Sequence, residues 1–175
     1  MSTIVPRLTT ERLVLRGFAR GDFDAFAADL AVRDVPPGPV DRRTAWRMFL
    51  SCSGTWLIHG IGWWGVELAA TKELVGTCGA FHREPHPDRE TPAEDLELGW
   101  TIFAPFRKQG YATEAARAVL DFVRRETKEP RIIALIDHEN SASIRVAENI
   151  GLRYERDIDF YQEVRLRLYA LSRTA

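Results

Sequence analysis

The segment 107–112 (RKQGYA) has the residue types of an anion-binding loop. It joins a predicted strand, Leu96 to Phe103, to the strongest predicted helix, which runs from Ala112 to Glu126. The first N–H groups of a helix lack intrahelical partners, and the helix dipole is positive at that end. A phosphate or pyrophosphate can therefore bind there through backbone groups alone. Gly110 allows a close approach that a Cβ would obstruct, and Arg107 adds a positive charge. The pattern predicts either an anion site or only a turn made by Gly110.

Other patterns in the chain do not predict a nucleotide or metal site. Residues 60–65 (GIGWWG) match G-x-G-x-x-G, but the dinucleotide fingerprint of an oxidoreductase needs a helix after its glycines. Here two tryptophans and a predicted strand follow. His82 and His86 have the spacing of a helical metal pair, yet Pro85 and Pro87 prevent that helix. We therefore predict loop histidines and no bound metal.

Composition indicates one globular domain spanning residues 1–175. Hydrophobic residues make up 45% of the chain and charged residues 28%, a balance that supplies a core. The net charge is −1, so a basic face for nucleic acid or for a membrane surface is not expected. Two cysteines cannot form a disulfide framework. The first residues lack the apolar stretch of a signal peptide, and every apolar run is too short to span a bilayer. We expect a cytoplasmic protein with no nucleic-acid and no membrane partner.

Strands and helices alternate along the chain, which predicts an α/β fold with a mixed sheet. Asp22 is the predicted N-cap of the first helix, and Asn140 that of the last. Expected strands are 13–15, 63–68, 74–81, 96–103, 132–136, 154–160 and 164–171, with a loop at 82–95. Expected helices are 23–30, 41 to about 50, 112–126 and 141–150.

Several stretches together resemble a known family. The spacing Arg107-x-x-Gly110-x-Ala112 fits the acetyl-CoA signature Q/R-x-x-G-x-G/A of the GNAT N-acetyltransferases. Residues 97–102 (ELGWTI), followed by 107–115 (RKQGYATEA), resemble the RimJ/RimL-like branch of that family. Residues 10–16 (TERLVLR) resemble its opening strand, and 140–152 (NSASIRVAENIGL) its N-x-x-S segment. The resemblance covers nearly the whole chain in order.

This resemblance implies a fold and a cosubstrate. The GNAT fold is a mostly antiparallel twisted sheet, flanked by helices, with a central pair of splayed parallel strands that hold acetyl-CoA. Here those strands are the predicted ones at 96–103 and 132–136. The implied acetyl-CoA contacts are Thr101, Ile102, Phe103 and Asn140 for the pantetheine arm, and Arg107, Gln109, Gly110, Tyr111, Ala112 and Thr113 for the pyrophosphate.

The resemblance also implies a reaction in which an amine attacks the thioester directly. The amine must lose a proton and the CoA thiolate must gain one. Glu97 is the candidate base, with a surface position on its strand as the alternative. The tyrosine that serves many relatives as the acid is replaced by Ala147. Ser143 is the candidate acid instead, or else a hydroxyl that bonds the first turn of its helix.

The acceptor amine is the least defined partner. It could be a protein N-terminus or a small amine, and the protein a monomer or a homodimer. In the loop 82–95 and the strand start that follows it, acidic residues outnumber Arg83 and Arg89, which predicts a cationic or N-terminal amine as acceptor. A peptide with a free N-terminus and acidic side chains would also fit, because the facing helix carries Arg42, Arg43 and Arg47. Because the tyrosine is missing, a non-catalytic CoA-binding module of the same fold is the alternative.

Overall fold

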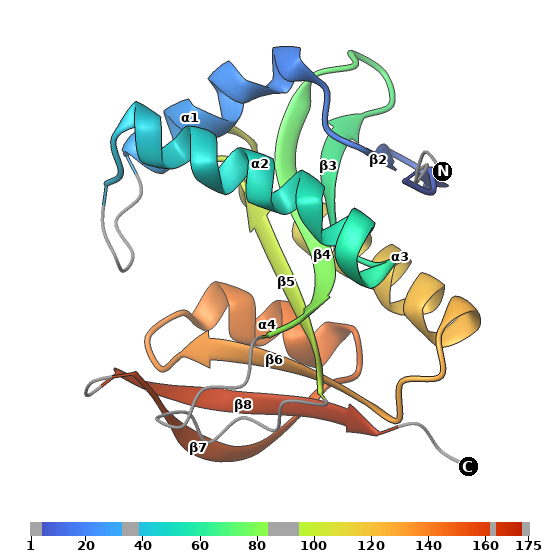
Figure 1. The fold of residues 1–175 in the computed structure, drawn as a ribbon. Helices are drawn as coiled ribbons and strands as arrows, with labels where there is room; N and C mark the ends of the chain where they lie inside the picture. The colour runs from blue at the N-terminus through green and yellow to red at the C-terminus, as the bar shows by residue number, and fades with distance from the viewer. Residues whose placement is uncertain (1–4, 33–38, 84–94, 162–163, 173–175) are drawn as a thin grey trace.

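One eight-stranded sheet organises the fold (Figure 1). The structure is a computed structural model, and it describes residues 5–32, 39–83, 95–161 and 164–172. The strand order is β1-β2-β3-β4-β5-β6-β8-β7. The strands are β1 (Leu8–Thr9), β2 (Leu13–Arg16), β3 (Trp63–Leu68), β4 (Leu74–His82), β5 (Leu96–Ile102), β6 (Arg131–Asp137), β7 (Arg153–Tyr161) and β8 (Val164–Ser172).

The sheet divides at β5 and β6, its one parallel pair among the paired strands described. These strands pair at Leu96 with Ile132 and at Glu97 with Ile133, and their pairing ends there. The rest of β5 pairs on its other side, with β4. Figure 1 shows β5 and β6 running apart from this point. The mixed sheet with a splayed parallel pair, predicted from the sequence, is confirmed.

Helices cover both faces of the sheet. They are α1 (Phe23–Ala31), α2 (Arg42–His59), α3 (Tyr111–Glu126) and α4 (Ser141–Asn149). The apolar stripe of α3 packs with α4 against the face that carries Leu96, Leu98 and Ile102. A second cluster joins α1 and α2 to Leu74 and Phe103 on the other face. Because side chains alternate along a strand, Glu97, Gly99 and Thr101 lie on the face that carries α1 and α2.

Two elements differ from the sequence predictions. The helix expected to end near Leu50 continues to His59. Its second half contains Ser, Gly and Thr, which are weak helix formers, and it exposes Leu57 and Ile58, so its pattern is not amphipathic. Packing of the buried Trp56 stabilises it, and the indole N–H donates to the Trp63 carbonyl at 2.8 Å. β1 has two residues, too few to show a period in the sequence.

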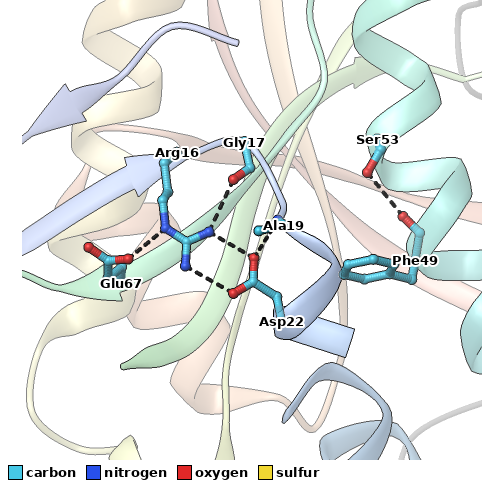
Figure 2. Close-up of polar contacts among 7 residues, drawn as sticks. All are labelled: Arg16, Gly17, Ala19, Asp22, Phe49, Ser53 and Glu67. Carbon is cyan, nitrogen blue, oxygen red and sulfur yellow. Dashed lines mark hydrogen bonds and ion pairs between the residues drawn. The ribbon is translucent and has the colours of Figure 1, made fainter. Parts of the chain in front are cut away.

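Arg16 forms an ion-pair network that fixes α1 to the sheet (Figure 2). Its guanidinium, on β2, donates two hydrogen bonds to Asp22 at 2.7 and 2.9 Å and one to Glu67 at 2.6 Å. Asp22 also accepts from the Ala19 amide at 2.7 Å. The Asp22 side chain therefore does not cap α1 as predicted. Because Glu67 lies on β3, the network joins the start of α1 to two strands.

The charge of Asp22 makes stability depend on pH. Burial alone would raise the pKa of Asp22, but the hydrogen bonds from Arg16 and Ala19 lower it below the ordinary value of 3.8. Such a carboxylate stabilises the fold above its unfolded pKa, and this stabilisation is lost as the pH falls through the lowered folded pKa. We expect Asp22→Asn to reduce the free energy of unfolding at neutral pH by about 1–3 kcal/mol. Below about pH 4, stability should fall less steeply with pH in this variant than in wild type.

Urea unfolding at a series of pH values measures both effects. Asp24→Asn is the matched control. Asp24 lies in the first turn of α1, and its exposed carboxylate pairs with Arg42 of α2. That change should alter stability by less than about 1 kcal/mol. If the free energy of unfolding of Asp22→Asn and of wild type changed with pH in parallel, the ionised Asp22 would not be the source of the pH dependence.

Candidate functional site

The loop before α3 has the geometry of an anion site. Gly110 is the N-cap residue, with φ +82° and ψ −1°, in the left-handed region that favours glycine. The first helical hydrogen bond runs from the Glu114 N–H to the Gly110 carbonyl. The N–H groups of Tyr111, Ala112 and Thr113 come before this bond, so they have no partner within the helix. The turn and the exposed amides predicted from the sequence are both present.

Arg12 contacts this loop from the connection between β1 and β2, a position to which its local sequence assigns no role at the site. It donates to the Gln109 carbonyl at 2.9 Å and lies over the Tyr111 ring, 4.8 Å from the ring centre. Its Nη2 is 3.4 Å from where a Cβ on Gly110 would lie. Residues 10–16 indicated only a strand, because a contact across about a hundred residues leaves no trace in local spacing. Arg12 therefore brings a positive charge to the amide groups at the start of α3.

Glu114 anchors Arg12 there. The Glu114 carboxylate accepts hydrogen bonds from the Arg12 amide at 2.9 Å, from Arg12 Nε at 2.7 Å and from the Thr10 hydroxyl at 2.6 Å. Burial alone would raise the pKa of Glu114, but these hydrogen bonds lower it below its ordinary value. Glu114 is therefore ionised at neutral pH, and Arg12 balances its charge beside the loop.

Arg107, the predicted cation of the loop, contacts the end of β5 and α1. Its Nε donates to the Ile102 carbonyl at 3.0 Å, and its Nη2 is 3.8 Å from Asp29 on α1. The side chain is half exposed. In this arrangement Arg107 holds the end of β5 and faces α1, whereas Arg12 contacts the loop.

Some backbone N–H and C=O groups of β5 point to β4, and the others point into the splay between β5 and β6. The Phe103 amide donates to Val75 of β4 at 2.9 Å. The Thr101 carbonyl is also directed at β4, since it lies 2.3 Å from where a Cβ on Gly76 would be. Backbone groups alternate in direction along a strand, so those of Trp100 and Ile102 face the splay. Of the predicted pantetheine contacts, Ile102 points toward the splay, while Thr101 and Phe103 hydrogen-bond toward β4.

The start of α4 follows directly after the other splayed strand. The Asn140 side chain accepts from the Ser143 amide at 3.0 Å, so the predicted N-cap is confirmed. Asn140 is exposed and Ser143 half-buried. Ala147 is fully buried in the core, so it offers no polar group to the splay. The structure thus places Asn140 and Ser143 together at the end of β6.

Glu97 lies where β5 and β6 begin to separate. It is 7% exposed and lies opposite Ile133 in the last recorded pair of the two strands. Its carboxylate accepts two hydrogen bonds from Arg83, both at 2.6 Å. The alternative of a surface position is therefore wrong, although the carboxylate is already engaged by an arginine.

Two further findings concern metals and membranes. Within the described ranges, no group of three or more His, Cys, Asp or Glu side chains could hold a metal ion. His86 lies outside the described residues, and His82 is 3.3 Å from Glu129. Over the same ranges, no helix has the length and hydrophobicity to cross a membrane. Residues 60–65 run from Gly60, the C-cap of α2, into the start of β3, so a strand and not a helix follows the first two glycines.

Comparison with known families identifies the family of this chain. The family model described as Acetyltransferase (GNAT) domain matches residues 12–153. The chain belongs to the GNAT acetyltransferase family. The matched range contains β5, the Gly110 loop, α3, β6 and α4, the elements that carry the candidate site of this GNAT protein.

Individual relatives agree with this assignment. This GNAT chain is 38% identical to the Bacillus subtilis protein YkkB over 100 residues, which are 57% of this chain and 55% of YkkB. The chain thus spans about half the length of that curated relative. It superposes on an acetyltransferase from Agrobacterium tumefaciens with a TM-score of 0.81 at 29% identity, covering 97% of this chain and 95% of that one. It shares its fold with RimL, a ribosomal L7/L12 alpha-N-protein acetyltransferase, with a TM-score of 0.71 at 15% identity, covering 95% and 98% of the two chains.

Proposed function

We propose that this protein transfers the acetyl group of acetyl-CoA to a primary amine, by direct attack of the amine in a ternary complex. The observation that carries the proposal is the splay between β5 and β6, with Glu97 at its closed end and the Gly110 loop beyond its open end. Family membership supports acetyl transfer. Acetyl-CoA supplies the activated acyl group and a thiolate leaving group.

The residues present fit acetyl-CoA. The amides of Tyr111, Ala112 and Thr113 offer donors for a pyrophosphate, with those of Gln109 and Gly110 beside them, and Arg12 offers a guanidinium for phosphate oxygens. Along β5, the backbone of Trp100 and Ile102 faces the splay and can pair with the pantetheine arm. At Ile102 the pairing group is the N–H, because the carbonyl already accepts from Arg107 Nε. Asn140 has an amide nitrogen beyond its capping oxygen, and this nitrogen can donate to the same arm. Arg107 is proposed to support the loop through β5.

Two proton transfers accompany the reaction. The acceptor arrives as an ammonium, and Glu97 is proposed to take its proton, directly or through water. Attack at the thioester carbonyl then breaks the C–S bond. Ser143 at the start of α4 is proposed to deliver a proton to the departing sulfur.

Replacing Ser143 with alanine should slow turnover modestly. A thiol has a pKa of about 8.5, so water can replace much of the acid, and we expect kcat to fall about tenfold with little change in KM for acetyl-CoA. Ser141→Ala is the matched control, since Ser141 is an exposed serine on the same helix. Steady-state kinetics of both variants test the role. If Ser143→Ala matches the control, the proton comes from water or from Tyr154, whose hydroxyl is 3.1 Å from Asp157.

The alternative function is a CoA-binding module without catalysis. It is favoured by one observation, the buried Ala147 where many relatives have a tyrosine. Calorimetry with acetyl-CoA, followed by thiol release across a panel of amines, separates the two functions. The proposal predicts binding and amine-dependent release. Binding without release by any amine would favour the module, and an absence of binding would overturn both.

A further inference from the structure

The ion pair of Arg83 and Glu97 lies on the face of the sheet opposite α3. Glu97 shares this face with Ile133, because the two residues are register partners in neighbouring strands. Phe81 is the register partner of Glu97 on β4 and lies on the same face. The start of α3, with its free amides, lies on the other side of the sheet. An acceptor that approaches from the Arg83 side therefore does not compete with acetyl-CoA for space.

Arg83 is held in place by aromatic rings. Its guanidinium carbon is 5.3 Å from the centre of the Phe81 ring and 5.0 Å from that of Phe160. Phe81 lies on β4 and Phe160 on β7, so Arg83 bridges the two halves of the splayed sheet. The side chain is 31% exposed, whereas that of Glu97 is 9% exposed. Arg83 is thus the solvent-facing partner of the pair, and its planar guanidinium suits a carboxylate.

The two described arginines near this position are each engaged by carboxylates. Arg83 pairs with Glu97, and Arg131 lies 3.7 Å from Asp95 at the start of the same strand. Arg131 also contacts Glu155 at 2.8 Å. The acidic residues at 84, 88, 90 and 94, on which the expectation of a cationic acceptor depended, lie outside the described residues. A purely cationic amine would bind Glu97 only by displacing Arg83, whose guanidinium would then have no carboxylate partner among the described residues. Such an unpaired, partly buried charge is unfavourable.

Resting on the proposed function, we propose that Arg83 and Glu97 together recognise an acceptor that carries a carboxylate a few bonds from its amine. The acceptor ammonium takes the place of Arg83 on Glu97, and the acceptor carboxylate takes the place of Glu97 on Arg83. The ammonium and carboxylate of the acceptor then pair with Glu97 and Arg83 respectively, so none of the four charges is left without a partner. Arg83 in this way keeps Glu97 occupied until an amino-carboxylate releases it.

Release of Glu97 couples recognition to chemistry. One proton passes from the acceptor ammonium to the freed Glu97, and the neutral nitrogen forms a bond with the thioester carbonyl carbon. The C–S bond breaks, and the sulfur leaves with its electron pair. The second proton of the nitrogen ends on the sulfur, so the products are an N-acetylated amino-carboxylate and CoA thiol. Free amino acids and peptides with an acidic first residue both present this chemistry.

The test compares matched acceptors in wild type and in Arg83→Gln. One arm uses free amino acids against their amides, and the other uses peptides that begin with Asp against peptides that begin with Asn. In at least one arm, wild type should show a kcat/KM at least tenfold higher for the carboxylate form. Arg83→Gln should abolish this preference by lowering the rate for the carboxylate form at least tenfold more than the rate for the amide. Arg125→Gln, which removes an exposed arginine paired with Glu126 on α3, should keep it.

Each outcome decides the inference. Equal rates or a preference for amides in both arms of wild type overturns it, as does a preference that survives in Arg83→Gln. If Arg83→Gln does not fold, Arg83→Lys, which keeps the charge but not the planar fork, should lose most of the preference, and the wild-type panel still stands. Amine-dependent CoA release without carboxylate preference rejects only this inference. No release with any amine rejects the proposed function as well.

Discussion

Replacing Glu97 with glutamine should lower kcat by roughly 10²–10⁴-fold while acetyl-CoA affinity stays nearly unchanged. Glutamine keeps the size of the side chain and can still accept a hydrogen bond from Arg83, but it cannot take a proton from the acceptor. The acid limb of the pH–rate profile should disappear as well, because that limb reports protonation of the base. Steady-state kinetics across pH and calorimetry with acetyl-CoA measure the three quantities.

Asp95→Asn provides the matched control for this loss. Asp95 is a buried carboxylate two residues earlier, 3.7 Å from Arg131, so its replacement removes a buried negative charge near Glu97 without touching the proposed base. We expect it to retain wild-type kcat within a few fold and to retain the acid limb. If Glu97→Gln behaves like Asp95→Asn, Glu97 is structural and the proton acceptor lies elsewhere.

Gly110→Val should weaken acetyl-CoA binding at least tenfold, which corresponds to ~1.4 kcal/mol. At φ +82° a β-branched residue is strained, so the turn must change and the amides of α3 must move from the pyrophosphate. A Cβ at this position would also approach Arg12 Nη2 to 3.4 Å. Calorimetry with acetyl-CoA is the measurement, with circular dichroism to confirm the fold.

Gly60→Val separates strain from cofactor contact. Gly60 has φ +68° at the end of α2, and a Cβ there would meet nothing within 4 Å. This variant should lose a similar amount of stability and keep its affinity for acetyl-CoA. Equal affinity in wild type and a folded Gly110→Val would remove the pyrophosphate assignment.

The sequence predicts those parts of the site that depend on local order. Gly110 could be assigned because a strand, a short loop and an amphipathic helix follow one another directly, and the left-handed φ confirms the need for glycine. The cap formed by Asn140 follows from the same kind of local pattern. The Gly110 turn and the Asn140 cap each depend on residues only a few positions away, so both can be predicted from local sequence.

Long-range contacts could not be predicted in this way. Arg12 reaches the Gly110 loop, and Arg83 reaches Glu97, only because strands distant in sequence become neighbours in the sheet. The direction of a strand's backbone groups depends on its register, so the resemblance implied contacts near Thr101, whereas the structure directs the backbone of Trp100 and Ile102 to the splay. Arg107 was assigned to the anion from its charge, whereas packing beside Asp29 and Ile102 decides where the guanidinium lies.

The most direct test of acetyl transfer is the stoichiometry of the reaction with an amine panel that includes amino-carboxylates. Purified protein is mixed with acetyl-CoA and each acceptor, and the released CoA thiol is counted together with the N-acetylated product by mass spectrometry. The account predicts one acetylated amine for each CoA released, with no acetylated protein intermediate in a mixture lacking acceptor. Tight binding of acetyl-CoA with no acetylated amine from any acceptor would contradict it.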